Sequence, residues 1–381
     1  MFVLSDEQKA LADAARAASL AHVAPTARED DERELFRKDI FRALGEAGLC
    51  GVPTPEAWGG LGLGYLDYAV VLEEIAKVSA SYAVTVAVNG LPQVILSQLG
   101  TDAQRAEWLP RLAAGEALGA FALSEPSSGS DAASLRATAV RDGDHYVLNG
   151  TKFWITHGGY ADVYVVMART GGPGPKGIGA FLVAGDTPGL SFGKKEEKMG
   201  MRASPTVEVV LENARVHASQ LIGGESEGFR CAMSALDSGR ITIGATSVGL
   251  AQAALDAAGA YACQRKQFDT QIIDFQGVGF MLADMACRVE TARLLVHKAA
   301  WLRDQKLPYS HVAAMAKCVA TDAAMSVTTD AVQVFGGYGY TREYPVERYM
   351  RDAKVMQIVE GTNQVQRVVI ARHLKRHYGE A

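Results

Sequence analysis

Hydrophobic residues in the first third of the chain recur at spacings of three and four, the period of an amphipathic helix. Ile40 and Leu44 lie on one such face, and glycine pairs or Gly-Thr-Asp runs separate the periodic segments. Ser5 and Gln8 have the spacing of a helix capping box, so the first helix is expected to begin beside them. The pattern predicts an N-terminal helical domain over residues 1–118.

The period changes after this region. Short apolar stretches of five to seven residues, such as 163–167, 178–183 and 206–211, alternate with turn residues such as Asn149-Gly150. Several strands at this spacing indicate a compact antiparallel β domain or barrel, which we place at 119–224.

Helical periodicity returns over residues 225–381, in much longer segments. Residues 232–262, 275–304 and 310–335 contain few helix breakers, and alanine and glycine occupy many periodic positions. Small residues at these positions favour close helix packing. The predicted fold is therefore α+β: an N-terminal helical domain, a middle antiparallel β domain or barrel, and a C-terminal four-helix bundle.

Composition narrows the class of protein. The 381 residues carry a formal net charge of −5 and no long basic run, which argues against a nucleic-acid partner. Five scattered cysteines without a Cys-x-x-Cys pair indicate a reducing compartment and no structural zinc. The N-terminus turns acidic at once, and no apolar run of about twenty residues occurs. We expect a cytoplasmic protein with no membrane span.

Two short motifs resemble well-known sites and fail on context. Residues 172–177 read G-x-G-x-x-G, but two prolines stiffen them and the next segment reads as a strand, so a hairpin connection is favoured over a dinucleotide site. His373 and His377 are four residues apart on a final helix, without a nearby acidic third ligand. We predict no metal site.

Three other segments contain residues suited to chemistry, although each has a plain structural interpretation. Residues 121–131 could be a strand leading into a Ser/Gly loop, and Trp154 could be a half-buried strand residue. Glu360 stands before a Gly-Thr pair and could be a helix-capping acid. Taken singly, each segment favours the structural interpretation.

Taken together, these segments resemble the acyl-CoA dehydrogenase family over nearly the whole chain. The resemblance rests on five ordered motifs: F-A-L-S-E-P…G-S-D at 121–131, W-I-T at 154–156, R-x-x-F at 265–268 with F-Q at 275–276, Q-V-F-G-G-Y-G-Y at 333–340, and E-G-T-N at 360–363. It implies an FAD enzyme that removes the α proton and β hydride of an acyl-CoA thioester. A flavin is required because no protein side chain accepts a hydride.

The family pattern also implies roles for individual residues. FAD contacts are implied for Phe121, Leu123, Ser124, Ser130, Trp154, Ile155, Thr156, Arg265, Phe275, Gln276, Gln333, Val334, Phe335, Gly336, Gly337, Thr362, Asn363 and Gln364. Substrate contacts are implied for Ser130, Asp237, Ser238, Gly239, Arg240, Gly361 and Arg372. Arg265, Phe275 and Gln276 match groups that reach the FAD of a neighbouring subunit, as do Gln333 to Gly337. This match implies a homo-oligomer, commonly a dimer of dimers.

Glu360 matches the catalytic base of the family. Some branches carry the base on the helix that contains position 239, and here that residue is Gly239. Burial by flavin and acyl chain would raise the pKa of the Glu360 carboxylate and make it a stronger base.

The sequence defines the acyl substrate and the electron acceptor less closely than it defines the catalytic base. Segments 165–177 and 187–195 resemble the isobutyryl-CoA branch, with butyryl-CoA and 2-methylbutyryl-CoA as rivals. The family pattern implies electron-transferring flavoprotein as the acceptor. Two alternatives stay open: a flavoprotein oxidase that uses O₂, and a non-catalytic binding protein on the same scaffold.

Overall fold

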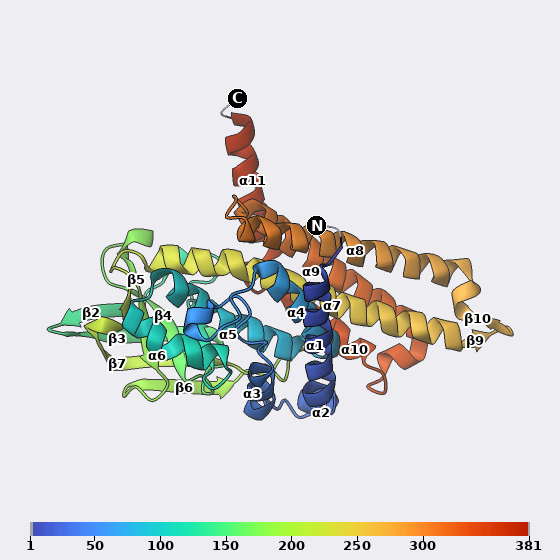
Figure 1. The fold of residues 1–381 in the computed structure, drawn as a ribbon, viewed down its shortest axis with the longest axis horizontal. Coiled ribbons are helices and arrows are strands. Elements are labelled where there is room, and N and C mark those ends of the chain that lie inside the picture. Colours follow the sequence, from blue (N-terminus) through green and yellow to red (C-terminus); the bar gives the residue numbers. More distant parts are fainter. Residues whose placement is uncertain (1–2, 380–381) are drawn as a thin grey trace.

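The computed structural model describes residues 3–379. The middle β region lies at one end of the long axis, the N-terminal helices lie near the centre, and the long C-terminal helices extend to the other end (Figure 1). The N-terminal region is helical, as predicted. Its helices are α1 (Asp6–Ala18), α2 (Ala27–Glu32), α3 (Lys38–Glu46), α4 (Tyr65–Val78), α5 (Ala80–Leu99) and α6 (Asp102–Ala113). The predicted capping box is present at α1, where the Ser5 hydroxyl accepts from the Gln8 N–H at 3.2 Å.

The middle region forms one eight-stranded sheet. Its strands are β1 (Gly119–Ala122), β2 (Thr138–Asp142), β3 (His145–Thr156), β4 (Val163–Arg169), β5 (Ile178–Ala184), β6 (Leu190–Lys195), β7 (Thr206–His217) and β8 (Leu221–Ile222). The strand order is β6-β7-β3-β2-β4-β5-β8, with β1 paired to β4. Residues 172–177 lie in the connection of the antiparallel β4–β5 pair, so the hairpin prediction is confirmed.

The sheet is mixed, whereas we predicted an antiparallel one. β1 runs parallel to β4 in the register Gly119 to Val163, because it enters the sheet directly from the N-terminal helices. Side chains fix this entry: the Gly119 N–H donates to Asn89 of α5 at 2.9 Å, and the Leu118 N–H donates to Asp162 at 2.7 Å. The pattern of apolar residues predicts which strands exist, but it does not predict whether a strand of four residues is parallel or antiparallel to its neighbour in the sheet.

The C-terminal region is a bundle of long helices, as predicted. Its elements are α7 (Gly228–Gln264), the short hairpin β9 (Lys266–Gln267) and β10 (Thr270–Gln271), α8 (Gln276–Asp304), α9 (Ser310–Phe335), α10 (Val346–Met356) and α11 (Asn363–Gly379). α7 packs against α4, α5, α8 and α9, while α11 projects away from the bundle (Figure 1). One buried apolar cluster joins the N-terminal helices to this bundle, so both share a core.

Two helices are long and apolar enough to cross a membrane, by length and composition only. They are α5 and α7, and 94% and 78% of their most apolar windows are buried inside the fold. This burial is typical of core helices in a packed domain.

Candidate active site

A bulge in β3 turns Trp154 out of the sheet. The pairing of β3 with β7 shifts register between Lys152 and Ile155, and Trp154 adopts a left-handed φ of 63°. An extra residue in a strand re-aims its side chain in this way. Trp154 is 60% exposed, while Ile155 beside it is buried in the sheet core. The bulge therefore presents a flat indole surface at the end of the strand.

The segment 121–124 lies against this bulge. The Phe153 N–H donates to the Ser124 carbonyl at 2.9 Å, so two of the predicted FAD-contact motifs are brought together directly. The fully buried Lys152 ammonium donates to the Leu123 carbonyl at 3.1 Å and to the Glu125 carboxylate at 2.7 Å. β3 thus holds the end of β1 through main-chain and side-chain bonds.

Glu125 is almost fully buried and well satisfied. Its carboxylate also accepts from the Arg136 and Ala137 N–H groups, at 2.6 and 2.9 Å. The Lys152 charge and these bonds outweigh burial and lower the pKa of Glu125, whereas burial lowers the pKa of Lys152 to about 8. No role was predicted for this pair, although a lysine and a glutamate beside apolar strand residues are a signal that the sequence contains.

Glu360 lies in a strained turn between α10 and α11. Its φ is +53° and that of Gly361 is +84°, so two consecutive residues adopt the left-handed conformation. A non-glycine residue is uncommon there, and such strain persists only where the surroundings fix it. The buried Gln366 amide donates to the Glu360 and Gly361 carbonyls at 3.0 and 2.8 Å, and the Thr362 hydroxyl accepts from the Val365 N–H at 3.3 Å.

The turn directs the Glu360 carboxylate into the protein. Glu360 Oε2 is buried and has no hydrogen-bond partner within the described residues 3–379. Burial raises the pKa of Glu360 to about 7, and the charges of Arg240 and Lys317 oppose that rise. A buried carboxylate without a partner is poised to accept a proton near neutral pH.

Gly239 of α7 makes room for this carboxylate. A Cβ built on Gly239 would lie 2.5 Å from Glu360 Oε2, so any side chain there would displace it. Ala235, one turn earlier on α7, belongs to the same buried cluster as Leu123. The 121–124 segment and the α7 turn just before Gly239 therefore contribute to one buried apolar cluster. Phe121–Ser124, Trp154–Thr156, Gly239 and Glu360 are termed the inner cluster below.

The other α7 residues predicted to contact substrate are held by internal bonds. Asp237 pairs with Arg240 and accepts from the Ser310 hydroxyl at 2.9 Å. The buried Ser238 hydroxyl accepts from Arg303 at 3.2 Å. Ser310 also lines a surface groove. Asp237, Ser238, Arg240 and Ser310 therefore connect the inner cluster with the protein surface.

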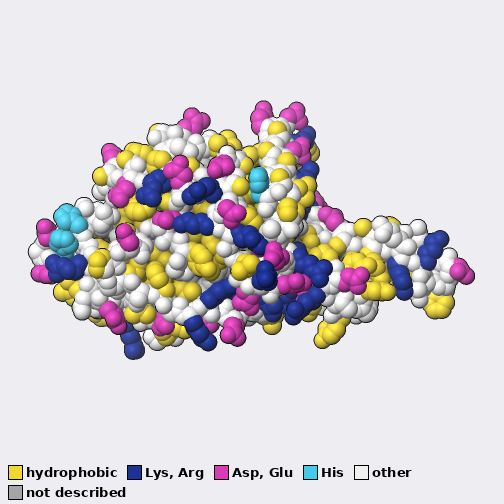
Figure 2. All heavy atoms as spheres, turned by 90° about the horizontal axis from the view of Figure 1, so that it is seen from below, with side chains coloured by type: hydrophobic (Ala, Val, Ile, Leu, Met, Phe, Trp, Pro, Cys, Tyr) yellow, Lys and Arg dark blue, Asp and Glu magenta, His cyan; other side chains and the backbone are white. Residues whose placement is uncertain are grey.

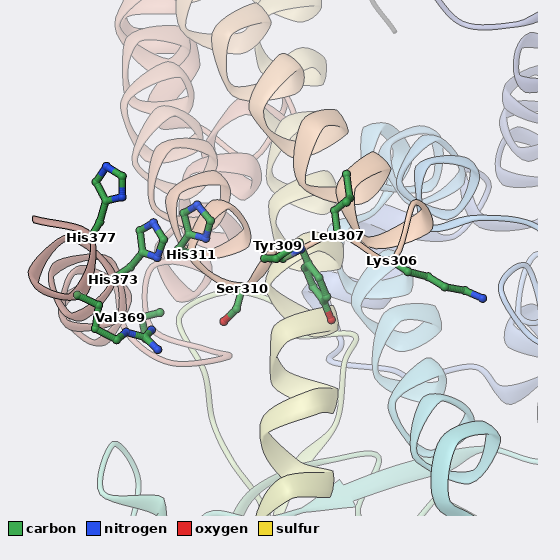
Figure 3. Close-up of a pocket in the computed structure, with 10 residues that line it drawn as sticks. Lys306, Leu307, Tyr309, Ser310, His311, Val369, His373 and His377 are labelled. Atoms are coloured by element: carbon green, nitrogen blue, oxygen red, sulfur yellow. The ribbon is translucent and has the colours of Figure 1, made fainter. Parts of the chain in front are cut away.

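The groove lies between the α8–α9 connection and α11 and has a volume of about 870 Å³ (Figure 3). Its described lining includes Lys306, Arg376 and three histidines, and no Asp or Glu. The rings of His311 and His373 stack with centroids 3.7 Å apart. A groove with these side chains suits an anionic ligand.

A second group of predicted FAD residues lies far from the first. Arg265 stands over the Tyr338 ring at 5.9 Å, which brings the 265–276 segment beside the 333–340 segment. Position 265 is 26 residues along α7 from Gly239, about 39 Å at 1.5 Å per residue. Arg265, Phe275, Gln276 and Gln333–Gly337 are termed the distal cluster below.

The distal cluster lies at the narrow projecting end of the molecule (Figures 1 and 2). Arg265, Gln276, Gln333, Gly336 and Gly337 are exposed there. Nearby Phe268 and Tyr340 are 91% and 90% exposed, a degree uncommon for large apolar side chains on a surface that contacts only water.

Several predicted contact residues turn their side chains inward. Ile155, Val334 and Phe335 are buried in the core, so only their main chains remain to meet a ligand. The buried Asn363 side chain bonds to Lys317, Thr321 and Asp322 and supports the Glu360 turn. The side chains of Ser130, Gln364 and Arg372 are exposed and take no part in the contacts around Asn363.

No group of three or more His, Cys, Asp or Glu side chains suited to a metal ion occurs within residues 3–379.

Comparison with known proteins identifies the class. The N-terminal, middle and C-terminal domain models of acyl-CoA dehydrogenase match residues 5–116, 120–214 and 226–375. The chain therefore belongs to the acyl-CoA dehydrogenase family, whose members are FAD flavoproteins and oxidoreductases. The predictions of family, of enzyme class and of FAD as cofactor are confirmed.

Individual relatives cover almost the full chain. A probable acyl-CoA dehydrogenase, FadE25 of Mycobacterium tuberculosis, is 48% identical over 99% of this chain and 97% of its own. The mitochondrial isobutyryl-CoA dehydrogenase of Dictyostelium discoideum is 44% identical over 98% and 90% of the two chains. The structure of butyryl-CoA dehydrogenase from Megasphaera elsdenii is 43% identical, with a TM-score of 0.96 over 98% of this chain and 99% of that one.

Proposed function

We propose that the protein oxidises a short or branched acyl-CoA to its trans-2-enoyl-CoA, with Glu360 as the base that removes the α proton. The observation that carries this proposal is that Glu360 Oε2 is buried and has no hydrogen-bond partner among the described residues. Burial also raises the pKa of the Glu360 carboxyl group to about 7. A structural carboxylate in this position would be paired, as Glu125 is.

The inner cluster fits a flavin. The exposed Trp154 offers a flat face beside the Ser124 and Thr156 hydroxyls, and the 121–124 segment is fixed against it. When bound, FAD would supply the acceptor for the β hydride. The chain's own residues would orient the thioester, exclude water and hold the α proton on Glu360 after transfer.

The basic groove beside α7 fits the phosphorylated end of coenzyme A. Its lysine and arginine supply cationic donors, and Ser310 links it to Asp237 and so to the inner cluster. A thioester bound through this groove would extend toward Gly239 and Glu360. Arg372, on α11, is proposed as an outer contact of the same ligand.

The distal cluster fits a second protomer. Arg265 lies about 39 Å along α7 from Gly239, the α7 residue beside Glu360, so we do not expect it to contact a cofactor bound at Glu360 of the same chain. We therefore propose a homo-oligomer in which the distal cluster of one subunit completes the FAD site of another. Exposed glycine N–H groups and an arginine suit a pyrophosphate.

The acyl group is proposed to be short or branched. An isobutyryl-CoA dehydrogenase and a dehydrogenase described as short-chain specific are equally similar to this chain, at 44% identity each. Anaerobic titration of the purified protein with C4 to C16 and branched acyl-CoAs would decide, because a true substrate bleaches the flavin absorbance. No bleaching by any acyl-CoA would contradict the proposed activity.

Electron-transferring flavoprotein is the proposed acceptor. A chain in the structure of the electron transferring flavoprotein of Acidaminococcus fermentans is 46% identical to this one, with a TM-score of 0.97. A prolyl acyl carrier protein oxidase with the same fold is 31% identical. Slow reoxidation in air and fast reoxidation by electron-transferring flavoprotein would support a dehydrogenase, whereas rapid peroxide formation would identify an oxidase.

A further inference from the structure

We infer that Lys317 is a positioning residue for the catalytic base: its buried ammonium anchors the Glu360–Gly361 turn and supplies a positive charge that keeps the Glu360 carboxylate ionised. The inference rests on the proposed role of Glu360. Lys317 does not touch the reacting atoms and acts through the turn that carries the base.

The first observation is the anchoring of the turn. Lys317 Nζ, on α9, donates to the Gly361 carbonyl at 3.0 Å and to the Asn363 side-chain oxygen at 2.9 Å. These bonds lie on either side of Thr362, so α9 grips the residues that immediately follow Glu360. Gln366 holds the same carbonyl from α11 at 2.8 Å. Two side chains from different helices thereby sustain a left-handed pair of residues.

The second observation is that Lys317 is fully buried without a carboxylate in contact. Its side-chain partners within residues 3–379 are neutral oxygens, and no ion pair includes it. An unpaired charge in such a place is costly, so a lysine is a poor choice for anchoring alone. A neutral donor such as glutamine would make similar bonds, as Gln366 does.

The third observation is the set of charges around Glu360. On α7, Arg240 faces it but is already paired with Asp237. On α11, Arg367 is paired with Asp322 of α9 at 3.1 Å. Arg240 has the larger effect on the pKa of Glu360 and Lys317 the second, and Cys318 and Asp322 of α9 also face Lys317. Of the two cations, Lys317 is the one that contacts no carboxylate among the described residues.

Burial shifts the pKa values of Glu360 and Lys317 in opposite directions. Burial raises the pKa of Glu360 to about 7 and lowers that of Lys317 to about 8, and each charge counteracts the shift of the other. Loss of the lysine charge would let the carboxyl hold its proton to higher pH, where it cannot act as a base.

The test compares two variants that separate charge from anchoring. Lys317→Met removes both, whereas Gln366→Met loosens the turn and leaves the charge. Lys317→Arg serves as the conservative rescue. In flavin-loaded protein without substrate, the titration of the Glu360 carboxyl is followed by ¹³C NMR and assigned by its absence in Glu360→Gln.

Lys317→Met is expected to move the Glu360 titration upward by about one pH unit, a tenfold change in proton affinity. Lys317→Arg should restore it, and Gln366→Met should lower the rate of flavin reduction without moving the titration. A folded Lys317→Met protein with an unmoved Glu360 titration would overturn the inference. This readout does not depend on turnover, so the proposed dehydrogenase activity can fail or stand separately.

If Lys317→Met does not fold, the wild-type protein gives the answer. Deprotonation of Lys317 should then appear as a second inflection near pH 8 in the Glu360 signal. A single inflection across that range would show that the two groups are uncoupled and would overturn the inference.

Discussion

The inner and distal clusters each contain residues that were predicted to contact FAD, but the environments of the two clusters differ. The inner cluster is held from within: Phe153 and Lys152 bond to the 121–125 segment, and Gln366 and Lys317 bond to the Glu360 turn. The distal cluster presents exposed residues at the end of the bundle, namely Arg265, Phe275, Gln276, Gln333, Gly336 and Gly337, while Val334 and Phe335 are buried. Under the proposed function, one protomer would contribute the reacting centre of its own site and an outlying part of the cofactor site of another protomer.

The largest expected effect comes from breaking the internal support of the inner cluster. In Lys152→Met the free energy of unfolding should fall by about 3 kcal/mol, because Glu125 stays buried without its cation. Chemical denaturation measures this. Lys9→Met removes the exposed Lys9–Asp6 pair and should change the free energy by less than about 0.5 kcal/mol. Equal losses in both variants would show that the buried pair has no special role.

The next effect tests the space that Gly239 leaves for the base. In Gly239→Ala the new methyl group would lie 2.5 Å from Glu360 Oε2, so the carboxylate must move. A displacement of about 1 Å can lower a rate about 100-fold, and we expect that loss in stopped-flow flavin reduction. Gly259→Ala is the matched control, because Gly259 also lies on α7 and a Cβ there meets nothing within 4 Å. A full rate in Gly239→Ala would contradict the geometry.

The distal cluster should affect cofactor binding and leave the base unchanged. Arg265→Ala is expected to weaken FAD binding at least about tenfold, the usual minimum for a lost charge-assisted hydrogen bond. Fluorescence titration of the apoprotein with FAD measures it. The Glu360 titration should stay at its wild-type midpoint, and a moved midpoint would show that the two clusters are not separate.

Mixed oligomers sharpen this comparison further. Trp154→Ala and Arg265→Ala each damage one contribution to a shared site. A dimer with one subunit of each kind should contain one doubly damaged and one intact FAD site, so about half of the tight binding should return. Tandem-tag purification of co-expressed subunits provides such dimers. No recovery would place the two clusters in unrelated sites.

The smallest effect is the pH dependence of the inner cluster. Glu360 must be ionised to accept the α proton, and its pKa is about 7. The rate of flavin reduction should therefore rise about tenfold from pH 6 to pH 8 and then level off. Since the folded state holds this proton more tightly than the unfolded state, the associated stability is present at low pH and is lost as pH rises through about 7. Glu360→Gln should remove both dependences.

Much of this architecture could be predicted from the sequence. Long periodic segments gave the extents of α8 and α9 to within a residue, because few breakers interrupt them. The hairpin at 172–177 and the cap at Ser5 follow from local chemistry. The parallel entry of β1 could not be predicted, since it depends on contacts with Asn89 and Asp162.

The site was predictable in outline only. Motifs identified Glu360 and Trp154, but their left-handed conformations depend on bonds from distant residues. Gln366 and Lys317 were missed. A charged residue among Ala313, Ala316 and Ala320 on an apolar helix face was the available signal for Lys317, but its target on α11 is set by tertiary packing. Asn363 was assigned to a ligand because its motif is shared, whereas its side chain faces inward.

The central claim concerns Glu360 as the base. Anaerobic stopped-flow mixing of Glu360→Gln with the best acyl-CoA substrate tests it most directly, with bound flavin quantified beforehand. The account predicts normal FAD content and thioester binding, with flavin bleaching slowed about 10³-fold. Bleaching at a near wild-type rate would contradict it and show that another group removes the α proton.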